Sequence, residues 1–217
     1  MKKAAIAIAL LAACPAIASA QLMYGSEVTG VVMIPTSSFS DAFGTGFGGT
    51  LGIFFDMEPN LRVTMSGGYL SSPVKESGVQ ELYEQAGGTG TVSPTGSVKV
   101  IPFLLGLQLI TPGPMRVYGS FEAGIYIYAV DVTATITDNT GSSNVTLADD
   151  TRTEFGANLG FGVLFPLKDN ISIAAGARYH FVKTSEFRST AGGASALTLS
   201  TNQFLSLGLG LNWAFPS

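Results

Sequence analysis

Apolar and polar residues alternate along most of the chain, with large apolar side chains at every second position. The alternation is clearest near the C-terminus, where leucines and aromatics at odd positions from 205 to 215 are separated by small or polar residues. A repeat of two residues is typical of a β-strand with one apolar face. The pattern predicts eight strands, at about residues 26–34, 46–57, 61–70, 97–110, 115–130, 153–165, 171–183 and 203–215.

The connections between these strands alternate in length. Residues 58–60, 111–114 and 166–170 are short and contain the Pro, Gly, Asn and Asp residues that favour turns. Residues 35–45, 71–95, 131–152 and 184–202 are long. This order predicts an all-β fold, an eight-stranded antiparallel up-and-down transmembrane β-barrel, with short periplasmic turns and long loops outside the cell.

Three of the long connections carry patterns of their own. Residues 131–137 and 144–148 keep the strand alternation, which predicts a hairpin that protrudes beyond the membrane. Residues 196–200 predict a similar extension before the last strand. Residues 79–86, followed by Gly87, predict a short helix.

The composition decides which face of the strands points outward. Only 12% of the residues are charged, whereas soluble domains contain about 25%. The face opposite the apolar one consists mainly of Gly, Ser, Thr and Asn, which suits the narrow lumen of a small barrel better than a surface in water. Aromatic residues of the apolar face gather toward both strand ends, as in the two girdles of membrane barrels. We therefore expect the odd-numbered side chains of the second to eighth strands to meet lipid.

The N-terminus reads as a secretory signal peptide. Lys2 and Lys3 precede an apolar core, and Ala18-Ser19-Ala20 is a small-residue cleavage site. We expect residues 1–20 to be removed and residues 21–217 to form one barrel domain in the bacterial outer membrane. The alternative reading of residues 11–14 is a lipoprotein box that lipidates Cys14, the only cysteine.

Charge and glycine patterns exclude two classes of partner. Without Lys2 and Lys3, the 11 basic residues fall to 9 against 15 acidic ones, a net charge near −6, which argues against a nucleic-acid partner. Residues 44–49, GTGFGG, match a dinucleotide-binding pattern. That pattern requires a helix after the glycines and an acidic residue about 20 positions later. Here a strand pattern follows and no acidic residue lies between Glu58 and Glu76, so no nucleotide or other cofactor is predicted.

The chain from residue 22 onward resembles the small OmpA/OmpX-type outer-membrane barrel domains. The resemblance rests on the signal peptide, the eight alternating segments, the strand–turn–strand MEPNLRVTMSGGYL and the closing aromatic strand LGLGLNWAF. It implies outer-membrane lipid as surroundings. It also implies that the barrel-assembly machinery recognises the C-terminal strand, although such barrels usually end on the aromatic residue and here Pro216 and Ser217 follow Phe215.

The inward positions suggest where chemistry lies. Counting along the strands places Glu122, Asn158 and Arg178 at a similar height in the lumen. Because a charge in a narrow lumen must be paired, we interpret them as a structural plug, with a gated ion path as the alternative. We expect a luminal polar network that consists of Glu122, Asn158, Arg178, His180 and Arg116.

Two classes of function remain open. The favoured one is a non-enzymatic barrel with a plugged polar lumen and long extracellular loops, in a structural or adhesion-like role through an extracellular ligand. The alternative is a narrow channel for small or hydrophobic solutes, similar to OmpW-type barrels, with Val98, Val100, Pro102 and Leu104 as an apolar luminal trough. Catalysis by His180 is not expected, because the following residues lack the serine found in similar deacylases, and no metal site is predicted.

Overall fold

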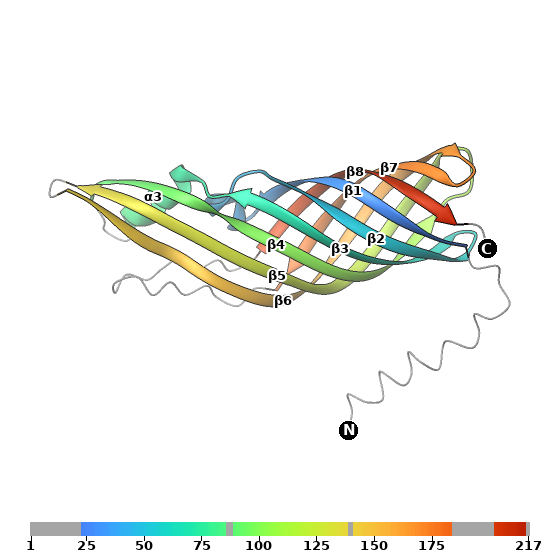
Figure 1. Ribbon diagram of the computed structural model, residues 1–217, viewed down its shortest axis with the longest axis horizontal. Coiled ribbons are helices and arrows are strands. Elements are labelled where there is room, and N and C mark those ends of the chain that lie inside the picture. Colours follow the sequence, from blue (N-terminus) through green and yellow to red (C-terminus); the bar gives the residue numbers. More distant parts are fainter. Residues whose placement is uncertain (1–22, 86–88, 139–140, 184–201, 216–217) are drawn as a thin grey trace, which may run out of the picture.

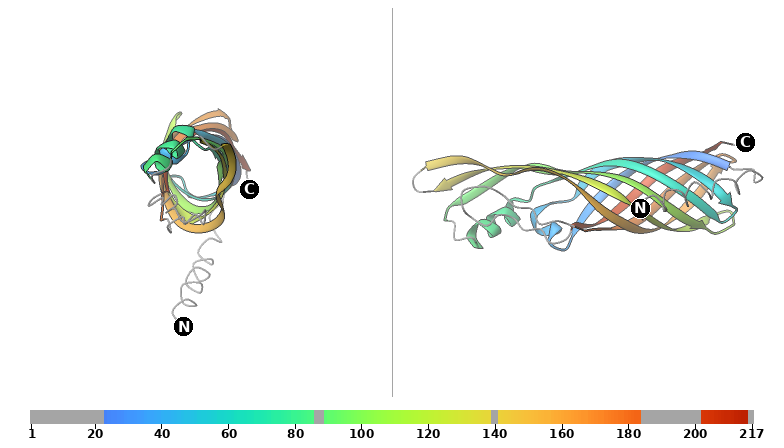
Figure 2. Two further views of the ribbon diagram at one scale, coloured as in Figure 1. Left: turned by 90° about the vertical axis from the view of Figure 1, so that its left-hand side faces the viewer. Right: turned by 90° about the horizontal axis from the view of Figure 1, so that it is seen from below.

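The computed structural model describes residues 23–85, 89–138, 141–183 and 202–215. These residues form eight antiparallel strands that close into one barrel, because β1 pairs with both β2 and β8. The view along the axis shows the closed ring (Figure 2). The strands are β1 Met23–Thr36, β2 Gly46–Glu58, β3 Leu61–Pro73, β4 Thr91–Ile110, β5 Arg116–Asp138, β6 Gly141–Lys168, β7 Ile171–Val182 and β8 Asn202–Phe215. The predicted fold class is confirmed. Most strands begin within a few residues of their predicted starts, but β4 and β6 begin earlier and β5 ends later than predicted.

The outward face of the barrel is the predicted one. From Phe47 to Phe215, the strongly exposed large apolar side chains of the described residues all have odd numbers. Leu209, Phe161 and Phe155 are among the most exposed, at 65%, 69% and 66%. Leaving such side chains in water is unfavourable, so this face is stable only against lipid.

The barrel is much longer on one side than on the other. The β5–β6 ladder continues from Arg116–Leu164 to Asp138–Gly141, and β4 joins it as far as Thr91–Thr137. These three strands extend beyond the rest of the barrel on the left of Figure 1. The predicted protruding hairpin is therefore confirmed, whereas the predicted extension at residues 196–200 lies outside the described residues.

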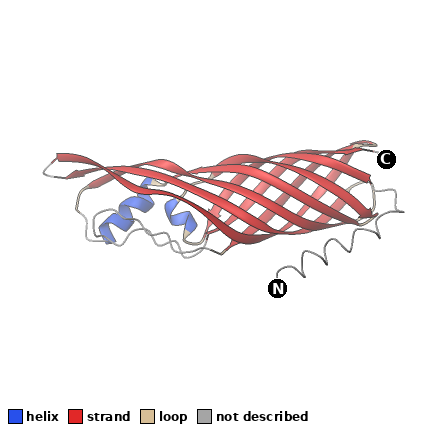
Figure 3. Cartoon of the chain, turned by 60° about the horizontal axis from the view of Figure 1, so that its bottom comes forward, coloured by secondary structure: helices blue, strands red, loops and turns tan. Residues whose placement is uncertain are grey.

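Two helices lie at this outer end of the barrel (Figure 3). Helix α3, Glu76–Gln85, confirms the predicted helix and packs Val79 against Val92 of β4 and Ala134 of β5. Helix α2, Phe39–Ala42, belongs to the first long loop. Among the described residues, no helix is long and apolar enough to cross a membrane.

The loop that contains α2 is tied to the end of β3. Gly44 N–H donates to the Pro73 carbonyl at 2.8 Å, and Lys75 N–H donates to the Ala42 carbonyl at 2.8 Å. These bonds hold Phe39 and Phe43 over the outer opening of the barrel, where both side chains are buried. The glycines at 44–49 thus end a loop and begin strand β2, as the sequence predicts, and a strand rather than a helix follows them.

Candidate functional site

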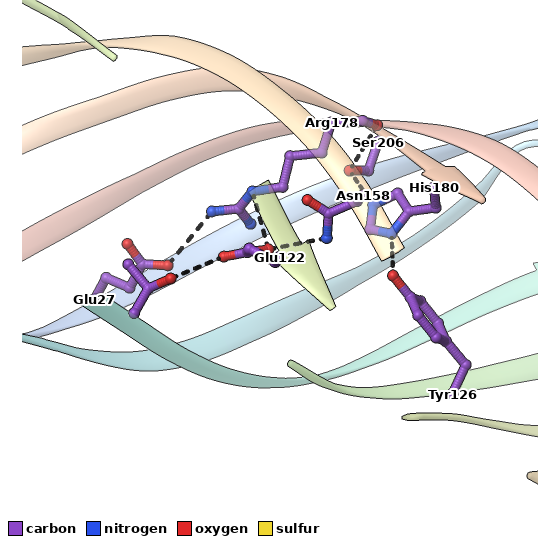
Figure 4. A network of polar contacts seen from close by, with 8 residues as sticks. Glu27, Glu122, Tyr126, Asn158, Arg178, His180 and Ser206 are labelled. Carbon is purple, nitrogen blue, oxygen red and sulfur yellow. Dashed lines mark hydrogen bonds and ion pairs between the residues drawn. The ribbon is translucent and has the colours of Figure 1, made fainter. Parts of the chain in front are cut away.

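The carboxylate of Glu122 is the centre of a polar network in the middle of the lumen (Figure 4). Glu122 lies on β5 directly opposite Asn158 on β6, because the two residues are partners in the ladder. Asn158 Nδ2 donates to Glu122 Oε2 at 2.9 Å, and Thr64 Oγ1 of β3 donates to Oε1 at 3.3 Å. Glu122 is only 1% exposed, so its charge depends on these partners.

Arg178 of β7 lies between two carboxylates from different strands. Its Nε atom is 3.8 Å from Glu122 Oε2, and its Nη2 atom is 3.7 Å from Glu27 Oε1 on β1. Both distances are longer than the 2.7–2.9 Å of a charge-assisted hydrogen bond. The guanidinium therefore forms two ion pairs and crosses the lumen between β5 and β1.

His180 continues the network toward the outer end. Its Nδ1 atom is 2.9 Å from the Tyr126 hydroxyl, and its Nε2 atom is 2.9 Å from Ser206 Oγ. Ser206 Oγ also donates to the Arg178 carbonyl at 3.4 Å. A neutral imidazole satisfies this chain, with Tyr126 donating to Nδ1 and Nε2 donating to Ser206. The ring stacks on Phe204, with 4.1 Å between the ring centroids.

Arg116 is the predicted network residue that the structure places elsewhere. It is the first residue of β5, six positions before Glu122, which corresponds to about 20 Å along the strand. It lines a hollow of about 30 Å³ at the periplasmic end together with Arg62 and Asn212. Arg62 is paired there with Asp56, through Nε–Oδ1 at 2.6 Å. Arg116 lies far from Glu122 because β5 begins at Arg116, directly after the short turn between β4 and β5.

The outer half of the lumen is apolar. The inward trough predicted on β4 is part of this layer, because Val98 and Val100 are fully buried and Leu104 is 6% exposed. Residues of β1, β3, β5, β7, β8 and the α2 loop complete it. We call this set the apolar cluster: Val31, Met33, Phe39, Ala42, Phe43, Leu70, Val98, Val100, Leu104, Tyr126, Tyr128, Val130, Val132, Val182 and Phe204.

Sequence reasoning missed several partners in this site. Glu27 has the inward parity on β1, but its pairing with Arg178 depends on closure of the ring, which brings β1 next to β8. Tyr126 follows Glu122 by four residues on the same strand face, and this spacing is a signal that sequence reasoning can use. Thr64 and Ser206 are ordinary small polar residues whose role appears only in the structure.

The arrangement offers limited chemistry. Ser206 and His180 form a Ser–His pair, but the second imidazole nitrogen contacts a tyrosine hydroxyl rather than a carboxylate. Both side chains are buried, at 7% and 4% exposure. Within the ranges that the structure describes, no group of three or more His, Cys, Asp or Glu residues is placed to hold a metal ion. A small cavity of about 20 Å³ beside Arg178 and Tyr118 has room for one water molecule.

Comparison with known proteins gives the family. No curated protein sequence matches the chain. Among solved structures, a major outer membrane protein from Thermus thermophilus has 16% identity and a TM-score of 0.52, covering 89% of this chain and 99% of that one. The outer membrane protein OprG from Pseudomonas aeruginosa has 10% identity and a TM-score of 0.50, covering 90% and 96%. At these identities the similarity concerns the fold.

The outer membrane protein β-barrel domain model matches residues 5–215, nearly the whole chain. This match agrees with the closed ring of eight antiparallel strands and with its apolar outward face. It also fixes the location of the barrel. The chain belongs to the outer-membrane β-barrel domain family and lies in the outer membrane of a bacterium.

Proposed function

We propose that this protein is a non-enzymatic outer-membrane barrel with a closed lumen, whose role is structural or depends on contacts made by its extracellular part. The observation that carries the proposal is the filling of the lumen by two layers. The apolar cluster fills the outer half, and the network of Glu27, Glu122, Asn158 and Arg178 crosses the middle. An eight-stranded barrel has an interior just wide enough for side chains.

The chemistry of the two layers supports closure. Ions do not cross an apolar layer readily, because they lose their hydration without gaining partners. Below it, Glu122 and Asn158 are 1% and 0% exposed, and the Glu122 carboxylate is held by Asn158 from β6 and by Thr64 from β3. Opening a path would separate Arg178 from two carboxylates and would remove Phe39 from its position beside Tyr128.

The extracellular part provides the surface for contacts. Strands β4, β5 and β6 form a three-stranded sheet beyond the barrel, and α3 covers the inward side of this sheet. The outward side carries exposed hydroxyl side chains such as Thr95 and Thr133. Sheets of this kind bind extended peptides or other surfaces through their strands. An extracellular ligand of this sheet is thus part of the proposal.

Processing and assembly complete the proposal. We infer that residues 1–20 are removed near Ala20 and that the mature chain is recognised by the barrel-assembly machinery through β8. The motivation is the aromatic end of β8, where Trp213 and Phe215 are exposed on the lipid-facing side. Phe215 is also the ladder partner of Tyr24 on β1, so the same end closes the barrel. Mass spectrometry of the purified protein tests the cleavage, since a mature chain that begins elsewhere than Gln21 would contradict it.

A narrow channel is the second candidate. Two small polar hollows, of about 20 and 30 Å³, lie at the mid-lumen and at the periplasmic end, and the Arg178 ion pairs are long. Vesicles with a potassium gradient separate the two functions. Vesicles that contain folded protein keep the gradient as long as empty vesicles if the lumen is closed. Rapid loss of the gradient with the wild-type protein would support the channel instead.

A further inference from the structure

An open apolar groove lies on the lipid-facing wall of the barrel, across β2, β3 and β4. Its volume is about 560 Å³. The walls are large apolar side chains that are exposed on this face: Leu51, Ile53, Met65, Tyr69 and Phe103. Other parts of the lipid-facing wall carry similar side chains, so the groove needs a local cause.

Two glycines form the floor of the groove. Gly67 is the ladder partner of Leu51 on one side and of Phe103 on the other, so the middle of this row has no side chain. Gly49, the partner of Tyr69, leaves a second gap in the next row toward the outer end. A Cβ atom at Gly67 would lie 3.4 Å from Phe103 Cδ1, which is an ordinary contact. The backbone could therefore accept a side chain at residue 67, but that side chain would occupy the groove.

The wall behind the groove has a gap in its hydrogen bonding. The β3–β4 pairing stops at Gly67–Phe103 and resumes at Leu70–Val100, within the described residues of both strands. In this register Gly68 lies opposite Pro102, which has no backbone N–H to donate. On the luminal side, Leu70, Val100 and Leu104 belong to the apolar cluster. The groove thus lies over an interruption of the β3–β4 pairing, with apolar side chains behind it.

The position of the groove identifies its occupant. Tyr69 lies near the outer end of β3, and aromatic residues at this level mark the boundary of the hydrocarbon region. From Tyr69 the groove runs along the wall toward the periplasmic end, past Met65 and Ile53. It therefore lies in the outer leaflet and is continuous with the lipid-facing surface. Water is excluded at this depth, so the occupant of this open apolar groove is a hydrocarbon chain of the surrounding lipid.

We propose that this groove is a binding site for one acyl chain of an outer-leaflet lipid. The chain lies over Gly49 and Gly67, between Leu51 and Phe103, and contacts the wall where the pairing of β3 with β4 is interrupted. A flexible chain fills the two missing side-chain positions, which a planar or branched molecule fills less well. The site holds this lipid longer than the rest of the barrel surface holds its neighbours.

Photocrosslinking in lipid tests the proposal. The folded full chain is placed in bilayers of dimyristoyl phosphatidylcholine that contain a trace of the same lipid with a diazirine in one acyl chain. After irradiation, crosslinked residues are identified by mass spectrometry. We expect crosslinks at Leu51, Met65 and Phe103 to be several-fold more frequent than at Leu159, Phe161 and Leu209, which lie on other strands and are exposed to a similar degree. Equal labelling of the two sets would overturn the proposal.

Two glycine variants provide the matched comparison. Gly67→Leu fills the groove, and we expect it to reduce labelling of the groove residues to the level of the other lipid-facing residues. Gly119→Leu adds the same side chain on the lipid-facing side of β5, where nothing lies within 4 Å of an added Cβ atom, and should leave labelling of the groove unchanged. Unchanged labelling in Gly67→Leu would contradict the proposal. If this variant fails to fold, Gly67→Ala with a proportionally smaller reduction provides the same test.

Discussion

Glu122 and Asn158 face each other across the β5–β6 ladder, and the Asn158 amide donates a 2.9 Å hydrogen bond to the Glu122 carboxylate. This contact holds one carboxylate oxygen on the β6 side, while Thr64 holds the other from β3. Arg178 is then the cation that balances the buried charge. The stability of the mid-lumen therefore depends on residues that are far apart in the sequence.

Removing either partner of the buried pair should be costly, and removing both should cost less than the sum. We expect Glu122→Gln and Arg178→Met each to lower the free energy of unfolding by about 3–5 kcal/mol. Arg178→Met leaves two buried carboxylates without their cation, and Glu122→Gln removes one of the two carboxylates that balance Arg178. Reversible unfolding in lipid vesicles, read as a double-mutant cycle, measures the coupling. Arg152→Met is the matched control, since Arg152 pairs with Asp150. Its loss of stability should add to that of Glu122→Gln. Additive losses for Glu122 and Arg178 would contradict the pairing.

Phe39 should hold the α2 loop in the outer opening. Phe39→Ala removes the contacts with Phe43 and Tyr128, and core Phe→Ala changes typically cost about 3–5 kcal/mol. Because the loop can leave the opening without unfolding the strands, we expect faster hydrogen exchange at residues 39–44 and little change in the strands. Phe47→Ala, on the lipid-facing side, is the control and should not affect this loop. Unchanged exchange in Phe39→Ala would mean that other contacts hold the loop.

Inward and outward glycines should respond differently to a methyl group. A Cβ atom at Gly106 would lie only 2.5 Å from Glu122 Cγ, whereas Gly119 has open space. Gly106→Ala should therefore destabilise the barrel by about 1–3 kcal/mol through overpacking. Gly119→Ala should be neutral or slightly stabilising, because alanine restricts the unfolded chain. Equal effects in unfolding titrations would show that the lumen is less tightly packed beside Glu122 than described.

A charge on the lipid-facing side should be costly only within the membrane. Leu209→Arg should make folding into vesicles less favourable by about 2–4 kcal/mol if residue 209 lies near the midplane of the bilayer. Thr133→Arg, an outward position on the protruding part of β5, should have almost no effect. A neutral Leu209→Arg would contradict the assignment of the odd-numbered face to lipid.

Much of the fold follows from the sequence because one physical pattern dominates it. Lipid on one side and a narrow lumen on the other impose strict alternation, so residues such as Leu205–Phe215 define both a strand and its orientation. The short turns also carry their own signal, as at Gly113, which has a positive φ of 131° between β4 and β5. Beyond the membrane the alternation is less regular, so the sequence predicts the extension of β6 only at residues 144–148, whereas the structure has one continuous strand from Gly141 to Lys168.

The site could be predicted only in part. Glu122 and Asn158 lie on adjacent strands joined by a hairpin, so counting residues is enough to bring them together. The contact of Arg178 with Glu27 depends on the tilt of the strands around a closed ring, which shifts heights between strands that are not neighbours in sequence. The burial of Phe39 and Phe43 depends on how a loop folds back, and no periodic pattern encodes this.

The most direct measurement of the central claim, a closed lumen, is single-channel conductance in planar lipid bilayers. The sample must contain only folded barrel, which is verified by the different migration of unboiled and boiled protein on a denaturing gel. We predict that the wild-type protein gives no stable current steps, because the apolar cluster and the Glu122–Arg178 network both block the axis. Reproducible ohmic steps from the folded wild-type barrel would contradict the closed lumen and would identify the protein as a channel.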